Sequence, residues 1–260
     1  MSLTLQFLGT GTSVGVPQIG CQCPACTSTD ARDKRRRSGV YVRSGDAAFV
    51  IDTPPEFRVA CLELGIVKVD ACVLTHAHMD HIAGFDDLRR FNTLNGKTVM
   101  RCYAAPETVD AMHHVFPYIT TKPNKIGLFR PMIDFRRVTR AFRIGGVKLT
   151  PLPVEHGGVR TNGYLIEAEG RCAAYISDCF SIPAATMKKI RGVDVLVLDC
   201  LRTRFHPTHM NLELALAAVK SIEPRRTFFI HMGHDVKHAE FEAALPRSVR
   251  LSYDGLKIRV

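Results

Sequence analysis

The chain has 260 residues, of which 46% are hydrophobic, and its formal net charge is +10 at pH 7. This apolar content can fill one large core, but no stretch approaches the roughly 20 consecutive apolar residues of a membrane span. The composition therefore excludes a membrane-spanning chain, and the charge favours an anionic partner such as a phosphate ester, a nucleotide or RNA.

The N-terminal segment MSLTLQFLGTG predicts a strand. It lacks the basic segment, apolar run and small-residue cleavage site of a signal peptide, so we expect a cytoplasmic protein. The nine cysteines are consistent with the cytoplasm, because a disulfide framework is not expected in a chain of this size without a secretory signal. Six of them stand singly among apolar residues and are expected to be buried reduced thiols: Cys61, Cys72, Cys102, Cys172, Cys179 and Cys200.

The other three cysteines lie close together in the sequence GCQCPAC. Cys21, Cys23 and Cys26 offer three soft ligands to tetrahedral Zn²⁺, which needs a fourth. A redox role is also open, although no thioredoxin-like pattern surrounds this Cys-x-x-Cys spacing. The basic run RDKRRR at 32–37 follows, and it favours a solvated loop over a nucleic-acid patch because no aromatic residues are interleaved with it.

Short apolar runs rich in β-branched residues alternate irregularly with helical patterns along the chain. The predicted strands are 3–9, 47–52, 71–76, 98–104, 147–154, 163–170, 172–178, 193–200 and 226–232. The predicted helices are 56–65, 106–116, 183–192, 211–223 and 237–246. Strands precede the first helix and follow one another later, which favours a layered α/β domain with mixed sheets over a strictly alternating one. The basic, proline-containing stretch 110–146 predicts a loop-rich insertion beside the site.

The segment LTHAHMDHIAG, residues 74–84, carries the densest set of metal-binding side chains. An apolar strand ends directly in His76-x-His78-x-Asp80-His81. His76 and His78 can converge if the backbone stays extended, whereas Asp80 and His81 follow as the chain turns and can face a second metal. Imidazoles and carboxylates are ligands that Zn²⁺ and related divalent ions prefer. This density at a strand end predicts a metal site.

The motif resembles the signature of the metallo-β-lactamase-fold hydrolases, which implies a four-layer αββα sandwich with mixed sheets. It implies one domain over 1–260, with an N-terminal zinc loop at about 20–38. The family's later ligands match His156, Asp178 and His231, each at the end of a predicted strand. By this resemblance one metal is bound by His76, His78 and His156, the second is bound by Asp80, His81 and His231, and Asp178 bridges both.

The implied chemistry is hydrolysis at two divalent metal ions, Zn²⁺ or Mn²⁺. Two such ions roughly 3.5–4 Å apart can hold a hydroxide for attack on phosphorus, and Asp80 is counted as catalytic beside its role as a ligand. Asp52 and Asp199 end strands nearby and are expected to accept hydrogen bonds from metal-bound histidines. For Asp199 the capping of a turn is an equally good interpretation. The β-lactamases themselves usually carry a cysteine where Asp178 stands, which disfavours an antibiotic hydrolase.

Further segments resemble the PhnP-type phosphodiesterases of phosphonate breakdown: LGTGTSVGVPQIGCQCPAC, PLPVEHGGVRTNGYLIE, LDCLR and IHMGHD. Those enzymes open 5-phosphoribosyl 1,2-cyclic phosphate to ribose 1,5-bisphosphate, which implies a small phosphorylated substrate. A histidine before a late helix contacts the phosphoryl group in that branch. The match is His209, expected to stabilise charge and protonate the leaving oxygen, with His206 as the competing candidate. Asp86, Asp87 and Arg89 could contact the substrate or line a solvated helix.

The same resemblance supplies the missing zinc ligand. PhnP-type enzymes complete their N-terminal zinc site with a histidine three residues after the last catalytic ligand, which here is His234. The expected structural zinc site is therefore Cys21, Cys23, Cys26 and His234. The branch also points to a homodimer. The alternatives are a nucleotide or cyclic-nucleotide phosphodiesterase, a tRNA 3′-processing endonuclease, a thioester hydrolase and a non-enzymatic metal-binding module. Nucleic acid is not favoured, because 110–146 is short for a tRNA-binding arm.

Overall fold

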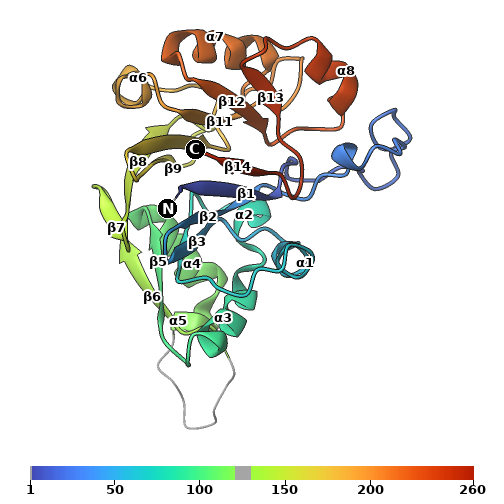
Figure 1. Cartoon of the computed structure of the whole chain (residues 1–260). Coiled ribbons are helices and arrows are strands. Elements are labelled where there is room, and N and C mark those ends of the chain that lie inside the picture. The colour runs from blue at the N-terminus through green and yellow to red at the C-terminus, as the bar shows by residue number, and fades with distance from the viewer. Residues whose placement is uncertain (1, 121–129) are drawn as a thin grey trace.

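The computed structural model describes residues 2–120 and 130–260, and it has four layers. Two sheets lie face to face, with helices on the outer side of each (Figure 1). In the described residues each sheet has seven strands, in the orders β14-β1-β2-β3-β4-β5-β6 and β13-β12-β11-β10-β9-β8-β7. Each contains parallel and antiparallel pairs, for example β3 with β4 and β1 with β2. The predicted αββα sandwich with mixed sheets is confirmed.

The strands follow from short apolar runs whose side chains alternate between the two faces of a sheet. The first sheet is built from β1 (Thr4–Gly9), β2 (Gly39–Ser44), β3 (Ala47–Ile51), β4 (Ala71–Val73), β5 (Met100–Ala104), β6 (Ile133–Arg137) and β14 (Lys257–Arg259). The second is built from β7 (Phe142–Ile144), β8 (Val147–Val154), β9 (Thr161–Ala168), β10 (Arg171–Ile176), β11 (Val195–Asp199), β12 (Arg226–Ile230) and β13 (Val249–Leu251). Every strand predicted from sequence is present, and most have shifted ends.

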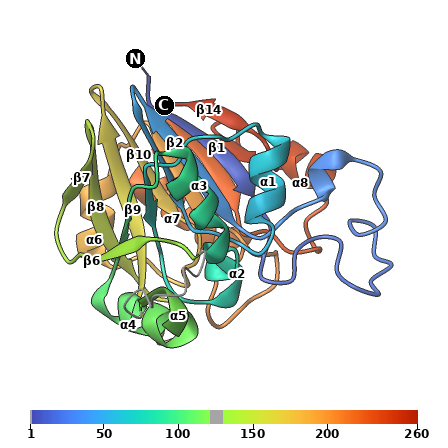
Figure 2. The ribbon, with the colours of Figure 1, turned by 90° about the horizontal axis from the view of Figure 1, so that it is seen from below.

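The helices cover the two outer faces, and Figure 2 shows α1 and α3 lying over the strands of the first sheet. On that side lie α1 (Phe57–Glu63), α2 (Met79–Ile82), η2 (Phe85–Asp87), α3 (Leu88–Leu94), α4 (Pro106–Val115) and α5 (Pro117–Thr120). The second sheet is covered by α6 (Ala184–Ile190), α7 (Leu212–Ile222) and α8 (His238–Ala243). All five predicted helices are present. No helix in the described segments is long and apolar enough to cross a membrane.

Three apolar layers hold the sandwich together. The middle layer lies between the sheets and includes Phe7, Phe49 and Tyr164, each fully buried. The outer layers pack each sheet against its helices, as Phe57 does on one side and Phe229 on the other. Burying so much apolar surface is the main driving force for this arrangement.

The expected loop-rich insertion at 110–146 is wrong for its described part. That part contains most of α4, then α5, β6 and β7, and the two strands form edges of the two sheets. Pro117 opens a helix, a position that needs no backbone donor, and Pro131 precedes a strand. The arginines of β6 are exposed, as is common on an edge strand, and they obscured its pattern. The rest of the prediction concerns 121–129, which lie outside the described residues.

The loop between β1 and β2 projects from the sandwich, and the arginine run lies within it (Figure 1). Arg35 is fully buried and its guanidinium lies 3.1 Å from the Asp33 carboxylate. Arg36 lies 3.1 Å from the Asp254 carboxylate, and Arg37 pairs with Glu56. The predicted solvated loop is therefore wrong for Arg35. Much of the basic run is used in ion pairs that fasten the loop to the rest of the protein.

Candidate metal centre

The predicted ligands and Asp52, which was expected to support them, meet at one edge of the sandwich because they follow the carboxyl ends of strands. Asp52 follows β3, Asp178 follows β10 and His231 follows β12, and these strands belong to both sheets. Asp52 and His231 have left-handed backbones, with φ of 66° and 62°. Such values are uncommon outside glycine and cluster at functional sites. The turn they impose ends each strand and directs the side chain across the sheet edge.

The first group of donors consists of His76, His78 and His156. Nε2 of His76 lies 2.8 Å from Nδ1 of His78, and Nε2 of His156 lies 3.4 Å from that same nitrogen. His76 and His156 are buried, whereas His78 is exposed. Three ring nitrogens so close together can bind one cation on a common side.

The second group consists of Asp80, His81, Asp178 and His231, whose donor atoms lie within 4.8 Å of one another. Nε2 of His81 lies 3.3 Å from the Asp80 carboxylate and 3.2 Å from that of Asp178. Nε2 of His231 lies 3.4 Å from the other oxygen of Asp178. Asp178 is also close to His156 and His209, so its carboxylate lies between the two groups.

The far nitrogens of the two buried histidines of the first group, His76 and His156, are held by acceptors. Nδ1 of His76 donates to the Thr75 hydroxyl at 3.0 Å, and that hydroxyl donates to Asp52 at 2.8 Å. Nδ1 of His156 donates to the Thr208 carbonyl at 2.8 Å. Each bond leaves Nε2 as the free lone pair, which is the form that binds a metal.

The buried histidines of the second group are held in the same way. Nδ1 of His81 donates to Asp52 at 2.8 Å, which agrees with the supporting role expected of Asp52. Nδ1 of His231 lies 3.2 Å from the Ser38 hydroxyl, which donates to the Gly11 carbonyl and so accepts from the histidine. Sequence reasoning missed Ser38, and nothing in its surroundings of arginine and glycine indicated this role.

Some buried polar atoms of the two donor groups have no hydrogen-bond partner, which fits the binding of divalent cations. Nε2 of His81 and one carboxylate oxygen of Asp178 are buried without a hydrogen-bond partner. Such atoms are costly to bury unless something else satisfies them, and a cation would. Burial alone would raise the pKa of Asp178, but the neighbouring His231 and His81 rings hold it well below its ordinary value. The carboxylate is thus available as an anionic ligand.

His209 lies over the centre. Its ring stacks on that of His231, with centroids 4.8 Å apart, and meets the ring of His156 edge-on at 4.6 Å. Its Nδ1 donates to Asp199 at 2.7 Å. Burial alone would lower the pKa of His209, but the Asp199 carboxylate raises it above its ordinary value. His206 lies one step further out, with its ring 5.2 Å from that of His209.

The sequence led us to expect that Asp199 would accept a hydrogen bond from a metal ligand. In the structure it supports no ligand of either donor group. Its carboxylate accepts from His209 and from the backbone N–H of Cys179, at 2.7 and 2.9 Å. The strand-end position was the only signal in the sequence, and it could not tell which histidine the carboxylate would meet. Asp199 is a positioning residue for His209.

The charged residues after the metal motif contact one another. Asp86 pairs with Arg89 and accepts a hydrogen bond from the Tyr118 hydroxyl at 2.7 Å. Asp87 is half-buried, and burial raises its pKa. No contact recorded in the described residues links Asp86 or Asp87 to the two donor groups, so both stay outside the site.

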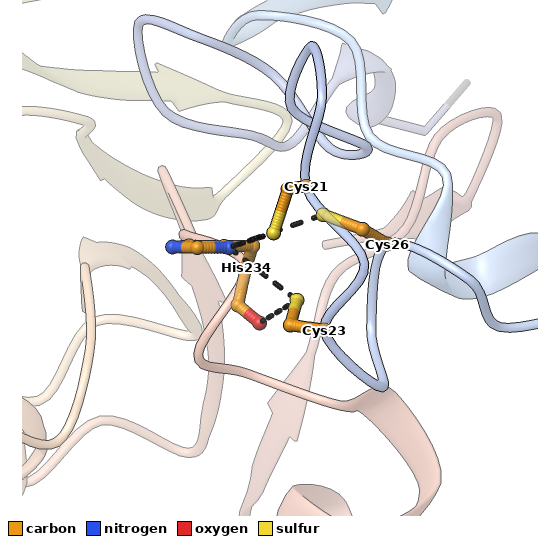
Figure 3. Close-up of side chains that lie close together, drawn as sticks. All are labelled: Cys21, Cys23, Cys26 and His234. Atoms are coloured by element: carbon orange, nitrogen blue, oxygen red, sulfur yellow. Dashed lines mark hydrogen bonds between the residues drawn. The ribbon is translucent and has the colours of Figure 1, made fainter.

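A second cluster lies at the projecting loop, where Cys21, Cys23 and Cys26 point toward His234 (Figure 3). The three sulfurs lie 3.2, 3.4 and 3.9 Å from Nδ1 of His234. Tetrahedral Zn²⁺, with bonds of about 2.3 Å to sulfur and about 2.0 Å to nitrogen, places such atoms about 3.5 Å apart. The four side chains therefore fit a closed structural zinc site.

An αββα sandwich with two groups of histidine and aspartate donors at one edge defines the metal-dependent hydrolases of the metallo-β-lactamase fold. The model of the Beta-lactamase superfamily domain matches residues 47–232. The chain belongs to this superfamily. A solved structure described as a new diphosphatase from the PhnP family is 40% identical, with a TM-score of 0.92, and the match covers 100% of this chain and 98% of that one.

Two further relatives show how widely the fold is used. The octanoyltransferase of Porphyromonas gingivalis is 32% identical over 261 residues, which cover 96% of this chain and 50% of that protein. This chain thus spans about half the length of that relative. Zn²⁺-bound PqqB from Methylobacterium extorquens has a TM-score of 0.78 at 20% identity, covering 99% of this chain and 100% of that one. That likeness shows the fold alone.

Proposed function

We propose that this protein is a metal-dependent phosphoric diester hydrolase acting on a small substrate, such as 5-phosphoribosyl 1,2-cyclic phosphate or a nucleotide. The observation that carries the proposal is the position of Asp178. Its carboxylate lies within 4.8 Å of a donor atom of His156 on one side and of His81 and His231 on the other. One carboxylate between two donor groups favours a pair of cations.

When bound, two Zn²⁺ or Mn²⁺ ions would polarise a phosphoryl oxygen and make water a nucleophile at neutral pH. The side chains of the protein supply the metal ligands and a proton donor. His76, His78 and His156 would hold one ion, Asp80, His81 and His231 would hold the other, and Asp178 would be a ligand of both. His209 faces the same space with its proton stabilised by Asp199, so it can stabilise charge on the phosphoryl group and protonate the leaving oxygen.

The likeness to the PhnP-family diphosphatase supports hydrolysis at phosphorus over thioester hydrolysis. A tRNA nuclease loses support, because the basic run that could bind RNA is paired with acidic residues of the same chain. We propose a small phosphorylated molecule as the partner.

We further propose that Cys21, Cys23, Cys26 and His234 bind one structural Zn²⁺ and that the protein works in the cytoplasm. All nine cysteines lie in the described segments and none forms a disulfide there. Reduced thiols are characteristic of that compartment. The zinc would tie the projecting loop to the segment that follows His231.

Turnover of a substrate panel tests the proposal. The Mn²⁺- or Zn²⁺-loaded protein is incubated with 5-phosphoribosyl 1,2-cyclic phosphate, a 2′,3′-cyclic nucleotide, an aryl phosphodiester, precursor tRNA and a glutathione thioester. We expect the highest kcat/KM on a small phosphodiester. Preferred turnover of the thioester or of precursor tRNA would overturn the proposal.

A further inference from the structure

Two phenylalanines lie beside the metal centre and have no part in binding metal. The ring centroids of Phe180 and Phe205 are 6.0 Å apart, with the planes at 86°. Phe205 is 64% exposed, although burying so large an apolar side chain would be favourable. Phe180 is half-buried beneath this contact, so the exposed ring of Phe205 is the surface available to a ligand.

Phe180 is tied to the donors by the backbone. It follows Asp178 by two residues, and its N–H donates to the Glu155 carbonyl at 2.7 Å. Glu155 directly precedes His156. Phe180 therefore lies next to ligands from both donor groups.

Phe205 reaches the same rim from the loop that carries His209. It directly precedes His206, whose ring lies 5.2 Å from that of His209. The Arg202 side chain donates to the Phe205 carbonyl at 2.8 Å, which holds this part of the loop. The aromatic pair is thus adjacent to the proposed phosphoryl position.

Two more apolar side chains are exposed around the centre. Met79, between His78 and Asp80, is 56% exposed, and Val159, three residues after His156, is 37% exposed. The ligand space is therefore charged at its floor and apolar at parts of its rim. A molecule with a phosphate at one end and a flat apolar ring at the other matches both.

We propose that Phe205, supported by Phe180, stacks against the base of a nucleotidyl substrate. This rests on the proposed phosphodiester hydrolysis and narrows its substrates to those that carry a nucleoside. Stacking suits the pair because every base has a π face and an aromatic side chain accepts any of them. Phe205 would set KM for such substrates, while the reacting groups set kcat.

A matched pair of substrates tests the proposal. Adenosine 2′,3′-cyclic phosphate carries a base, and methyl riboside 2,3-cyclic phosphate has a methoxy group in its place. We expect Phe205→Ala to raise KM for the adenosine compound about tenfold and to leave KM for the methyl riboside unchanged. Leu62→Ala, at a 66% exposed site on α1, is the matched control. An equal effect of Phe205→Ala on both substrates, or none, would overturn the proposal.

Binding can be measured without turnover, because the chain contains no tryptophan. Phe205→Trp places a single indole at the rim. We expect adenosine 5′-monophosphate to quench its fluorescence and ribose 5-phosphate to leave it unchanged, with Leu62→Trp unaffected by either. Equal responses to the two ligands would overturn the stacking role. If wild-type protein turned over neither of these two cyclic phosphates, the substrate panel would still decide the proposed hydrolysis, and this binding result alone would decide the stacking role.

Discussion

The hydroxyl of Ser38 lies 3.2 Å from Nδ1 of His231, although 193 positions separate the two residues along the chain. Ser38 closes the projecting loop that begins near Gly11, and its hydroxyl donates to the Gly11 carbonyl at 2.9 Å. His234, which faces the three cysteines of that loop, follows His231 by three residues. The loop is therefore fastened at two points to the segment that carries a proposed ligand.

Ser38→Ala removes the acceptor that orients His231. We expect the affinity of one of the two catalytic metals to fall about 10- to 100-fold, because such supporting bonds fix the ring and its tautomer. A chelator competition titration measures this. Ser28→Ala, in the same loop but away from His231, should have no effect. Equal affinities in wild type and Ser38→Ala would contradict the positioning role.

His209→Ala should lower kcat for a phosphodiester about 10²- to 10⁴-fold, the range typical of a lost general acid. Metal content should stay unchanged, because neither donor group includes His209. His206→Ala is the matched comparison and should change kcat much less, since its Nδ1 accepts from Thr208 and it lies further from the centre. The reverse order of effects would assign the role to His206.

Cys23→Ala should remove one metal ion per chain from about three and lower the thermal midpoint of unfolding, because a structural zinc contributes folding free energy. Metal analysis and calorimetry measure the two effects. Cys172→Ala, a half-buried thiol elsewhere, controls for the loss of any cysteine. An unchanged metal count in Cys23→Ala would rule out the Cys₃His site.

Residues whose spacing along the chain forms a metal-binding motif could be predicted from the sequence. Residues that act through long-range contacts could not. A metal-binding motif is visible within a few residues, at His76, His78, Asp80 and His81. In the structure these side chains lie close to their downstream partners. Ser38 lies far from His231 in the chain, so its role depends on how the loop folds back. The contact between Asp199 and His209 could not be predicted for the same reason, because it depends on how the chain folds between them.

Some strands of the fold could likewise be predicted from their own residues, and others could not. Strands that are long and apolar, such as β8 and β11, were predictable from their own residues. The short strands β13 and β14, with three residues each, carry too little pattern. The edge strand β6 combines exposed arginines with half-buried apolar residues, so only its pairing with β5 identifies it.

Asp254 should give stability an unusual pH dependence. Its buried carboxylate accepts from the Thr10 hydroxyl and the Arg36 backbone, at 2.8 and 2.7 Å, yet burial raises its pKa to about 6. A carboxyl group with a raised folded-state pKa binds its proton more tightly when folded. Its contribution to stability therefore grows as pH falls from about 6 toward about 4, by up to about 3 kcal/mol.

Urea unfolding of wild type and Asp254→Asn between pH 4 and 7 measures this contribution. The difference in unfolding free energy should change in favour of wild type as pH falls, because the variant cannot titrate at this position. A difference that stays constant across the range would show that the Asp254 pKa is not raised.

We propose that two cations that share Asp178 hydrolyse a phosphodiester. The most direct test of this proposal is turnover of an aryl phosphodiester as Mn²⁺ is returned stepwise to protein whose catalytic metals have been removed while the structural zinc is kept. We expect activity to rise until about two Mn²⁺ per chain have bound, and Asp178→Asn protein to stay inactive throughout. Full activity at one equivalent, or equal activity without added metal, would contradict it.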